Sequence, residues 1–153
     1  MSTAPIALPQ PTADECSNAM LVHILATFSG FIAPLIFFLV KKDSRFVKFH
    51  SLQVLIWHAA YMILFMLGMA IMFVVIFAEI AKSSGSHNGA GGPPPPAFFG
   101  IFGVVWLFGF GGGILNLVLG IVYAVKANRG EWARYPFIGD LVLHKILPEQ
   151  PLS

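Results

Sequence analysis

The sequence predicts an all-α membrane protein with three transmembrane helices, at about residues 20–40, 52–78 and 98–125. Each of these apolar runs lacks Asp, Glu, Lys and Arg. A helix needs about 20 apolar residues to cross the ~30 Å hydrocarbon core of a bilayer. Charged residues make up only 10% of the 153-residue chain, against about 25% in soluble domains. This composition argues against a water-soluble globule.

The domain organisation follows from the runs. Residues 14–147 are predicted to form a single helical membrane domain, between a disordered tail at 1–13 and a second tail at 148–153. The 82–96 loop is rich in Gly, Ser and Pro, a low-complexity composition with no expected fold. The apolar stretch 137–147 is too short to span and contains charged residues, so it predicts a short interfacial helix.

The distribution of cations predicts the orientation. Eight of the nine Lys and Arg residues follow either the first run or the third. Loops rich in Lys and Arg stay cytoplasmic, so three spans place the C-terminus inside, and the N-terminus and the 82–96 loop outside. The cluster after the first run is predicted to contact anionic lipid headgroups, a reading favoured over a protein-docking site. Its members are Lys41, Lys42, Arg45 and Lys48.

Small and polar residues predict which faces of the helices meet, because membrane helices associate through close approach and hydrogen bonds. In each run such residues recur at helical spacing and form a stripe. The predicted interior positions are His23, Thr27, Gly30 and Pro34 in the first run, His58, Tyr61, Phe65 and Gly68 in the second, and Gly109, Gly113, Asn116 and Gly120 in the third. We expect these three stripes to face one another.

Pro34 predicts a kink in the first transmembrane helix. Its ring displaces the carbonyl group of Gly30, four residues earlier, and Pro34 has no backbone N–H. A freed carbonyl in lipid needs a donor, and Asn116 is the candidate at the same predicted depth. A static packing kink is favoured over a moving hinge.

The runs carry few groups capable of chemistry. The absence of Asp and Glu argues against a proton-coupled or cation-coupled carrier. His23 and His58 are predicted to differ in depth by about 16 Å, too far for a shared metal, and are expected to form helix–helix hydrogen bonds more readily than to ligate haem or relay protons. Cys16 is the single cysteine and is expected to be an unmodified thiol. No catalytic, cofactor-binding or metal-binding motif is evident, and none of the composition suggests nucleic acid as a partner.

Two groups of motifs carry a family resemblance. They are Asn18-Ala19-Met20-Leu21, His23, Gly30, Pro34, Lys41-Lys42-Asp43-Ser44 and His50 towards the N-terminus, and Lys126-Ala127-Asn128, Gly130-Glu131 and Arg134-Tyr135-Pro136 towards the C-terminus. In these stretches the chain resembles the bacterial Tic-twenty-like family of small multi-pass membrane proteins, distantly related to a membrane subunit of the chloroplast import translocon. The resemblance implies a helical inner-membrane protein and no particular reaction. One departure is that the amide-rich patch after the loop histidine is reduced to Gln53.

The function predicted from the sequence is that of a non-enzymatic scaffold, assembly or translocation-associated component of the bacterial inner membrane. Its partners are expected to be the lipid bilayer and either a second copy of the chain or another membrane protein. The alternative is a subunit of an oligomeric small-solute transporter or channel, since three helices cannot enclose an aqueous pore.

Overall fold

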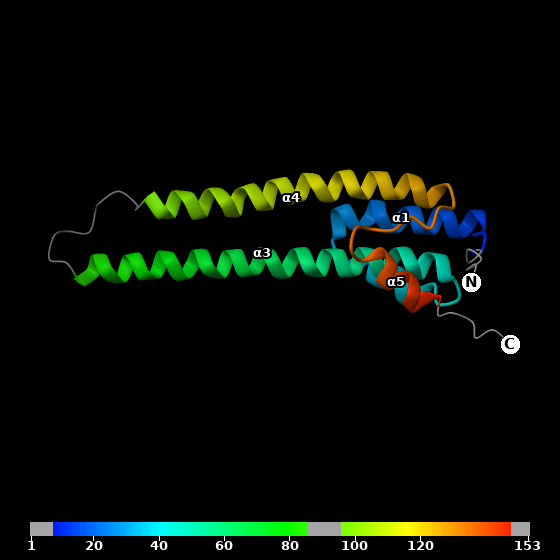
Figure 1. Ribbon diagram of the computed structural model, residues 1–153, viewed down its shortest axis with the longest axis horizontal. Helices are drawn as coiled ribbons and strands as arrows, with labels where there is room; N and C mark the ends of the chain where they lie inside the picture. The colour runs from blue at the N-terminus through cyan, green and yellow to red at the C-terminus, as the bar shows by residue number, and fades with distance from the viewer. Residues whose placement is uncertain (1–7, 86–95, 148–153) are drawn as a thin grey trace, which may run out of the picture. The chain divides into compact units, whose positions relative to one another are not determined.

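The computed structural model describes residues 8–85 and 96–147 (Figure 1). Residues 1–7 of the predicted first tail, the whole tail 148–153 and residues 86–95 of the low-complexity loop lie outside the described residues. The described residues form five helices and no strand. The helices are α1 (Ala13–Ser29), α2 (Ile32–Val40), α3 (Arg45–Gly85), α4 (Pro96–Asn128) and α5 (Gly139–Ile146).

The predicted all-α class is confirmed, but the prediction of three membrane-spanning helices is wrong. Two described helices are long and apolar enough to cross a membrane: α3 over Arg45–Lys82, with 38 residues, and α4 over Phe98–Asn128, with 31. Both exceed the length that a bilayer requires. The run predicted to be the first span is divided between α1 and α2.

The division lies at Gly30, which closes α1 with a φ of 62°, a conformation that glycine adopts without strain. Its N–H donates to the Ala26 carbonyl at 2.8 Å. One turn later, the Ala33 N–H donates to Ser29 Oγ at 3.2 Å, which satisfies one of the free donors at the start of α2. Pro34 is the third residue of α2, where its missing N–H leaves no bond unmade. The predicted kink is therefore a helix break.

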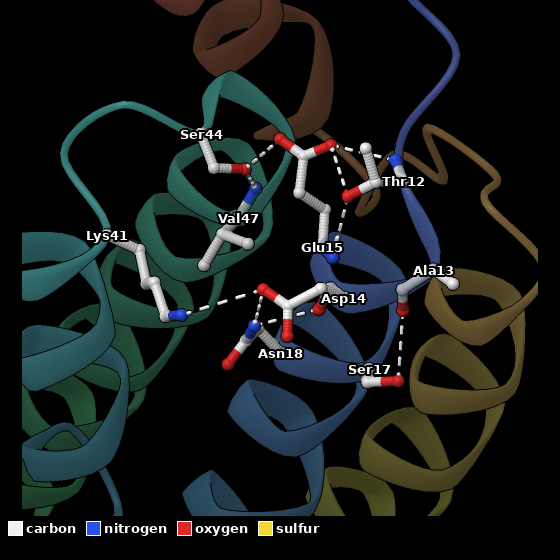
Figure 2. Close-up of polar contacts among 9 residues, drawn as sticks. All are labelled: Thr12, Ala13, Asp14, Glu15, Ser17, Asn18, Lys41, Ser44 and Val47. Atoms are coloured by element: carbon white, nitrogen blue, oxygen red, sulfur yellow. Dashed lines mark hydrogen bonds and ion pairs between the residues drawn. The ribbon is translucent and has the colours of Figure 1, made fainter.

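The chain reverses at this break, because α1 and α2 pack against each other and their far ends meet (Figure 2). Lys41 Nζ, just after α2, lies 3.7 Å from Asp14 Oδ2 in the first turn of α1. Ser44 Oγ donates to Glu15 Oε1 at 2.6 Å. A first run that crossed a membrane as one helix would place Asp14 and Lys41 at opposite surfaces, so the ion pair between them does not fit a single span.

The chain divides into two compact units. Unit 1 comprises residues Met1–Ala59 and Leu117–Ser153, and unit 2 comprises Ala60–Asn116. Within unit 1, α1, α2, α5 and the adjoining parts of α3 and α4 enclose the buried core. Its central apolar residues are Val22, Ala26, Val47, Val54, Tyr123 and Tyr135. A smaller cluster of Cys16, Ala19, Phe46 and Ala127 lies beside the start of α1.

Unit 2 consists of the remaining parts of α3 and α4, which pack through glycines. Gly109 lies against the ring of Phe65, and Gly68 faces Val105. Most large apolar side chains of this unit are exposed, including Phe77 at 67% and Val104 at 68%. Such a surface is expected where the surrounding solvent is lipid.

Candidate functional site

Unit 1 contains a buried polar cluster, which we call the polar clasp, formed by His23, His50, Gln53 and Tyr135. His23 lies on α1, His50 and Gln53 lie one turn apart on α3, and Tyr135 follows α4. All four side chains are almost completely buried. A buried polar group without a partner is costly, so each must find its hydrogen bonds inside the protein.

His23 and His50 form a chain of hydrogen bonds between the Tyr135 hydroxyl and the Glu131 carbonyl, and each group in the chain donates to the next. His50 Nε2 lies 3.2 Å from the Glu131 carbonyl oxygen, which can only accept, so Nε2 carries the proton. In a neutral ring Nδ1 of His50 then accepts from His23 Nε2, at 3.0 Å. His23 Nδ1 in turn accepts from the Tyr135 hydroxyl, at 3.2 Å. The bonding pattern therefore fixes the tautomer of both rings.

Gln53 holds the same segment from the next turn of α3. Its Nε2 donates to the Ala133 carbonyl at 3.2 Å, and its Oε1 accepts from the Tyr135 N–H at 2.7 Å. The segment 131–135 has no regular secondary structure, so its backbone groups need side-chain partners when it enters an apolar core. His50 and Gln53 supply those partners at every second residue, at Glu131, Ala133 and Tyr135.

Tyr123 of α4 secures the other side of this segment. Its hydroxyl donates to the Arg134 carbonyl at 2.7 Å, and its ring centroid lies 4.1 Å from that of Tyr135. Burial, with a smaller contribution from Tyr123, raises the pKa of Tyr135 well above its ordinary value. The Tyr135 hydroxyl therefore stays protonated and keeps donating to His23. The sequence predicted a position among the lipid headgroups for Tyr135 and at the inner interface for Tyr123, and both side chains are buried in the core of unit 1.

The hydrogen bonds of the polar clasp join α1, α3 and the segment after α4. The directional chain ends on a backbone carbonyl, which does not take up a proton, so the two imidazoles have no onward acceptor through Glu131. Both nitrogens of each ring are engaged by protein atoms. Over residues 8–85 and 96–147, no three His, Cys, Asp or Glu side chains gather in a group able to hold a metal ion.

The base of α1 forms a second polar group beside the basic loop (Figure 2). Thr12 and Glu15 form a capping box, in which the Glu15 N–H donates to Thr12 Oγ1 and the Thr12 N–H donates to Glu15 Oε2. The Ser44 hydroxyl, and then the Thr12 N–H, lower the pKa of Glu15 by favouring its ionised form. Of the four predicted headgroup-binding cations, Lys42 and Arg45 are exposed, and Lys41 and Lys48 are half-buried.

In unit 1 the structure brings together several of the residues predicted to face the interior. His23 and Pro34 are fully buried. A Cβ atom on Gly120 would lie 2.6 Å from Thr27 Oγ1, so α4 approaches α1 closely there. Gly30 lies at the reversal, and His58 Nδ1 bonds within its own helix to the Val54 carbonyl at 2.9 Å.

In unit 2 the contact between helices passes through Gly68, Gly109 and Gly112. A Cβ atom on Gly112 would collide with the ring of Tyr61, whose hydroxyl donates to the Gly109 carbonyl at 3.1 Å. A Cβ atom on Gly113 would meet nothing within 4 Å. Asn116 Nδ2 donates to the Gly112 carbonyl at 2.8 Å in its own helix, and its predicted bond to Gly30 stays a prediction.

Sequence reasoning missed the partnership between His23 and His50. The three-span interpretation placed these histidines near opposite surfaces of the membrane, whereas their rings lie 5.1 Å apart. Two signals could have revealed it: the Ser-Gly and Pro residues at the middle of the first run, and acidic residues before that run opposite basic residues after it. Gln53, Tyr123 and Gly112 were also missed as contact residues.

The motif residues around the end of α4 lie in or beside the clasp. Gly130 has a φ of 77° and packs against Pro11 and Cys16. Lys126 Nζ lies 5.6 Å from the ring centroid of Tyr123, and Asn128 is the last residue of α4. Glu131 contributes its carbonyl to His50, and Pro136 is exposed.

Comparison with known families identifies the chain. No curated protein matches it, and no solved structure matches it. The predicted resemblance to the Tic-twenty-like family is wrong, because the family profile that matches is a different one. The match covers residues 14–142, which include Glu15, all but the first residue of α1, the whole of α2 and every residue of the polar clasp. The chain belongs to the MamF/MmsF family, the magnetosome magnetite crystal formation proteins.

Proposed function

We propose that this protein is a component of the magnetosome membrane that acts in magnetite crystal formation as a non-enzymatic scaffold. The family match supports this setting and this process, and it narrows the membrane proposed for the protein from the bacterial inner membrane in general to that of the magnetosome. The two apolar helices α3 and α4 provide the membrane anchor.

The scaffold role is supported by the hydrogen bonds of the clasp side chains, which are made to other groups of the protein. His23, His50 and Gln53 all bind protein atoms, and two of the three bind the backbone of the segment after α4. Histidine is the residue type that an acid–base catalyst most often presents to a substrate. Here the clasp side chains hold the C-terminal part of the chain against α1 and α3.

The orientation of the scaffold follows from its cations. The basic residues after α2 and after α4 favour the cytoplasmic surface of the magnetosome for these segments. The α3–α4 connection, which includes residues 86–95 outside the described residues, then faces the compartment in which the mineral forms. In this arrangement α3 and α4 anchor the protein in the membrane, and the connection between them is the part that meets the growing crystal.

A gene replacement tests this function. In a magnetite-forming bacterium that encodes the chain, deletion is expected to change the size or shape of the crystals seen by electron microscopy. Wild-type protein is expected to restore them, and a variant with the connection 86–95 replaced by an unrelated Gly/Ser linker is expected to reach the magnetosome but fail to restore them. Normal crystals in the deletion strain would contradict a role in crystal formation.

The alternative of a transporter or channel subunit predicts that water reaches Asn116 and His58. Unit 2 instead carries a groove of about 570 Å³ with an almost wholly apolar lining, which includes Phe65, Met69 and Trp106. An apolar groove favours lipid over a hydrated path. Labelling of cysteines placed at Asn116 and His58 with a water-soluble reagent separates the two functions: reaction at both positions would favour transport.

A further inference from the structure

We propose that α1 and α2 form a re-entrant hairpin that enters and leaves a single leaflet of the membrane. Its partners are the acyl chains of that leaflet and, at its base, anionic headgroups. The N-terminus then lies on the same side as the C-terminus. This inference concerns how the protein sits in lipid and holds whether or not the protein acts on magnetite.

The base of the hairpin, where the start of α1 meets the loop after α2, consists of polar side chains that bind one another. Asp14 pairs with Lys41, and Glu15 accepts from Ser44, so the beginning of α1 is tied to the loop between α2 and α3. These groups stay in water or among headgroups, because charged side chains are costly in hydrocarbon. The loop also supplies the basic residues Lys42 and Arg45, which are exposed and suit an anionic surface.

The arms of the hairpin are too short to cross. At 1.5 Å per residue, the nine residues of α2 extend about 14 Å and the 17 residues of α1 about 25 Å. The hydrocarbon core is about 30 Å thick. Two antiparallel arms of this length reach into the membrane from one surface and return to it.

The outer face and the turn of the hairpin are apolar. Phe28 is 85% exposed at the turn, and Ile32, Ile36 and Val40 form an exposed row along α2. This row consists of large exposed apolar side chains, as do the exposed surfaces of α3 and α4. Those surfaces must contact acyl chains if α3 and α4 span the membrane. The opposite face of α1 is buried in the core of unit 1.

Backbone N–H groups at the turn find hydrogen-bond acceptors within the turn itself. A reversal inside lipid requires such bonds, because no water is available there. The Gly30 N–H donates to Ala26, the Ala33 N–H to Ser29 Oγ, and the Leu35 N–H to the Phe31 carbonyl at 3.1 Å. Pro34 removes one further donor at a position where α2 offers no acceptor.

A contact between the two ends of the chain supports the same-side arrangement independently. Trp132 Nε1, after α4, donates to the Pro9 carbonyl, before α1, at 3.0 Å. If α3 and α4 both span, the segments before α3 and after α4 share a surface. The segment before α1 therefore joins them there.

Reporter fusions test the topology without altering any residue. A reporter that is active only in the cytoplasm is expected to work at the N-terminus and equally after Ser153, and a reporter that is active only outside the cytoplasm is expected to fail at both ends. Activity of the outside reporter at the N-terminus alone would overturn the hairpin and restore three spans.

Cysteine labelling gives a second, independent readout. In a Cys16→Ala background, Ser17→Cys and Arg129→Cys are expected to react with a membrane-impermeant maleimide from the same side, and Lys82→Cys from the other. Phe28→Cys is expected to resist the reagent from both sides, and a fluorophore attached there in detergent before reconstitution is expected to be quenched by lipids with a quencher on the acyl chain. Reaction of Ser17→Cys from the side of Lys82→Cys would refute the proposal.

Discussion

His23 Nε2 lies 3.0 Å from His50 Nδ1, which joins two helices whose histidines are 27 residues apart in the chain. The bond exists only because the chain reverses at Gly30 between them. It continues from His50 to the Glu131 carbonyl, so a single line of hydrogen bonds ties α1, α3 and the segment after α4. The stability of unit 1 should therefore depend on this line.

Replacement of His50 by Ala tests the clasp. The variant leaves the buried His23 Nε2–H without its acceptor, which costs about 1–3 kcal/mol, and removes the donor to the part-buried Glu131 carbonyl. We expect a marked fall in the midpoint of thermal unfolding in detergent, followed by loss of the monodisperse peak in gel filtration. A double-mutant cycle with His23→Ala should be strongly non-additive, because both substitutions remove the same bond.

Ser51→Ala is the matched control beside His50. The Ser51 hydroxyl is fully buried and has no hydrogen-bond partner among the residues that the structure describes. Its removal relieves a desolvated polar group, so the variant is expected to unfold at the same temperature or a higher one. Equal destabilisation by both substitutions would mean that the site responds to any loss of volume and that the clasp has no special role.

Gln53→Glu tests how the segment 131–135 is held. The substitution keeps the acceptor for the Tyr135 N–H but sets a carboxylate oxygen against the Ala133 carbonyl, where Gln53 donates. We expect the segment to detach while α3 and α4 remain intact, and trypsin to cleave at Arg134 much faster than in the wild type. Unchanged cleavage would show that the tyrosines alone suffice to dock the segment.

Glu15 makes the base of the hairpin sensitive to acid. Its folded pKa lies below the ordinary value of 4.5 because Ser44 and Thr12 donate to the carboxylate. A depressed folded pKa contributes stability that is present above the unfolded pKa and is lost as pH falls through the folded one. The unfolding midpoint is therefore expected to drop in this acidic window, and Glu15→Gln is expected to flatten that drop. Glu79→Gln, which removes a carboxylate from unit 2, should leave it unchanged.

The sequence was sufficient for the all-α class and for the two long apolar helices, because apolar runs are a local property. It was not sufficient for the reversal at Gly30. A run of about 20 apolar residues fits a span and a hairpin equally well by length, and the contacts that distinguish them, such as the pair of Asp14 with Lys41, join residues far apart in the sequence. Once the run was interpreted as a span, His23 and His50 fell at opposite surfaces, and the clasp could not be predicted.

The pair Gly112 and Gly113 tests the packing of unit 2. The predicted stripe included Gly113, but only Gly112 faces Tyr61, whose hydroxyl oxygen would lie 2.9 Å from an added Cβ. Gly112→Ala is expected to displace the Tyr61 ring and destabilise the protein by about 1–3 kcal/mol, the usual cost of overpacking. Gly113→Ala should be neutral or mildly stabilising, since alanine favours a helix over glycine. Thermal unfolding of both variants gives the comparison, and a larger effect at Gly113 would refute the assigned contact.

The proposed hairpin also predicts a preference for curved membranes. A re-entrant α1–α2 pair adds two helices to one leaflet and none to the other, so it is accommodated best where that leaflet is expanded. The basic loop at its base favours the cytoplasmic leaflet, which is the outer, convex leaflet of an intracellular vesicle.

Reconstitution into mixed small and large vesicles measures this preference. Protein inserted with its termini outward is expected to concentrate, per unit lipid, in the small vesicles. The variant Phe28→Ser with Ile32→Ser removes apolar contact at the turn while leaving the ties of Asp14 and Glu15 at the base, and it is expected to distribute evenly. Val104→Ser with Phe77→Ser is the control, since it changes exposed apolar residues of α3 and α4 and leaves the hairpin untouched. Equal enrichment of all three proteins would mean that the hairpin does not wedge the leaflet, because the preference would then arise from α3 and α4 alone.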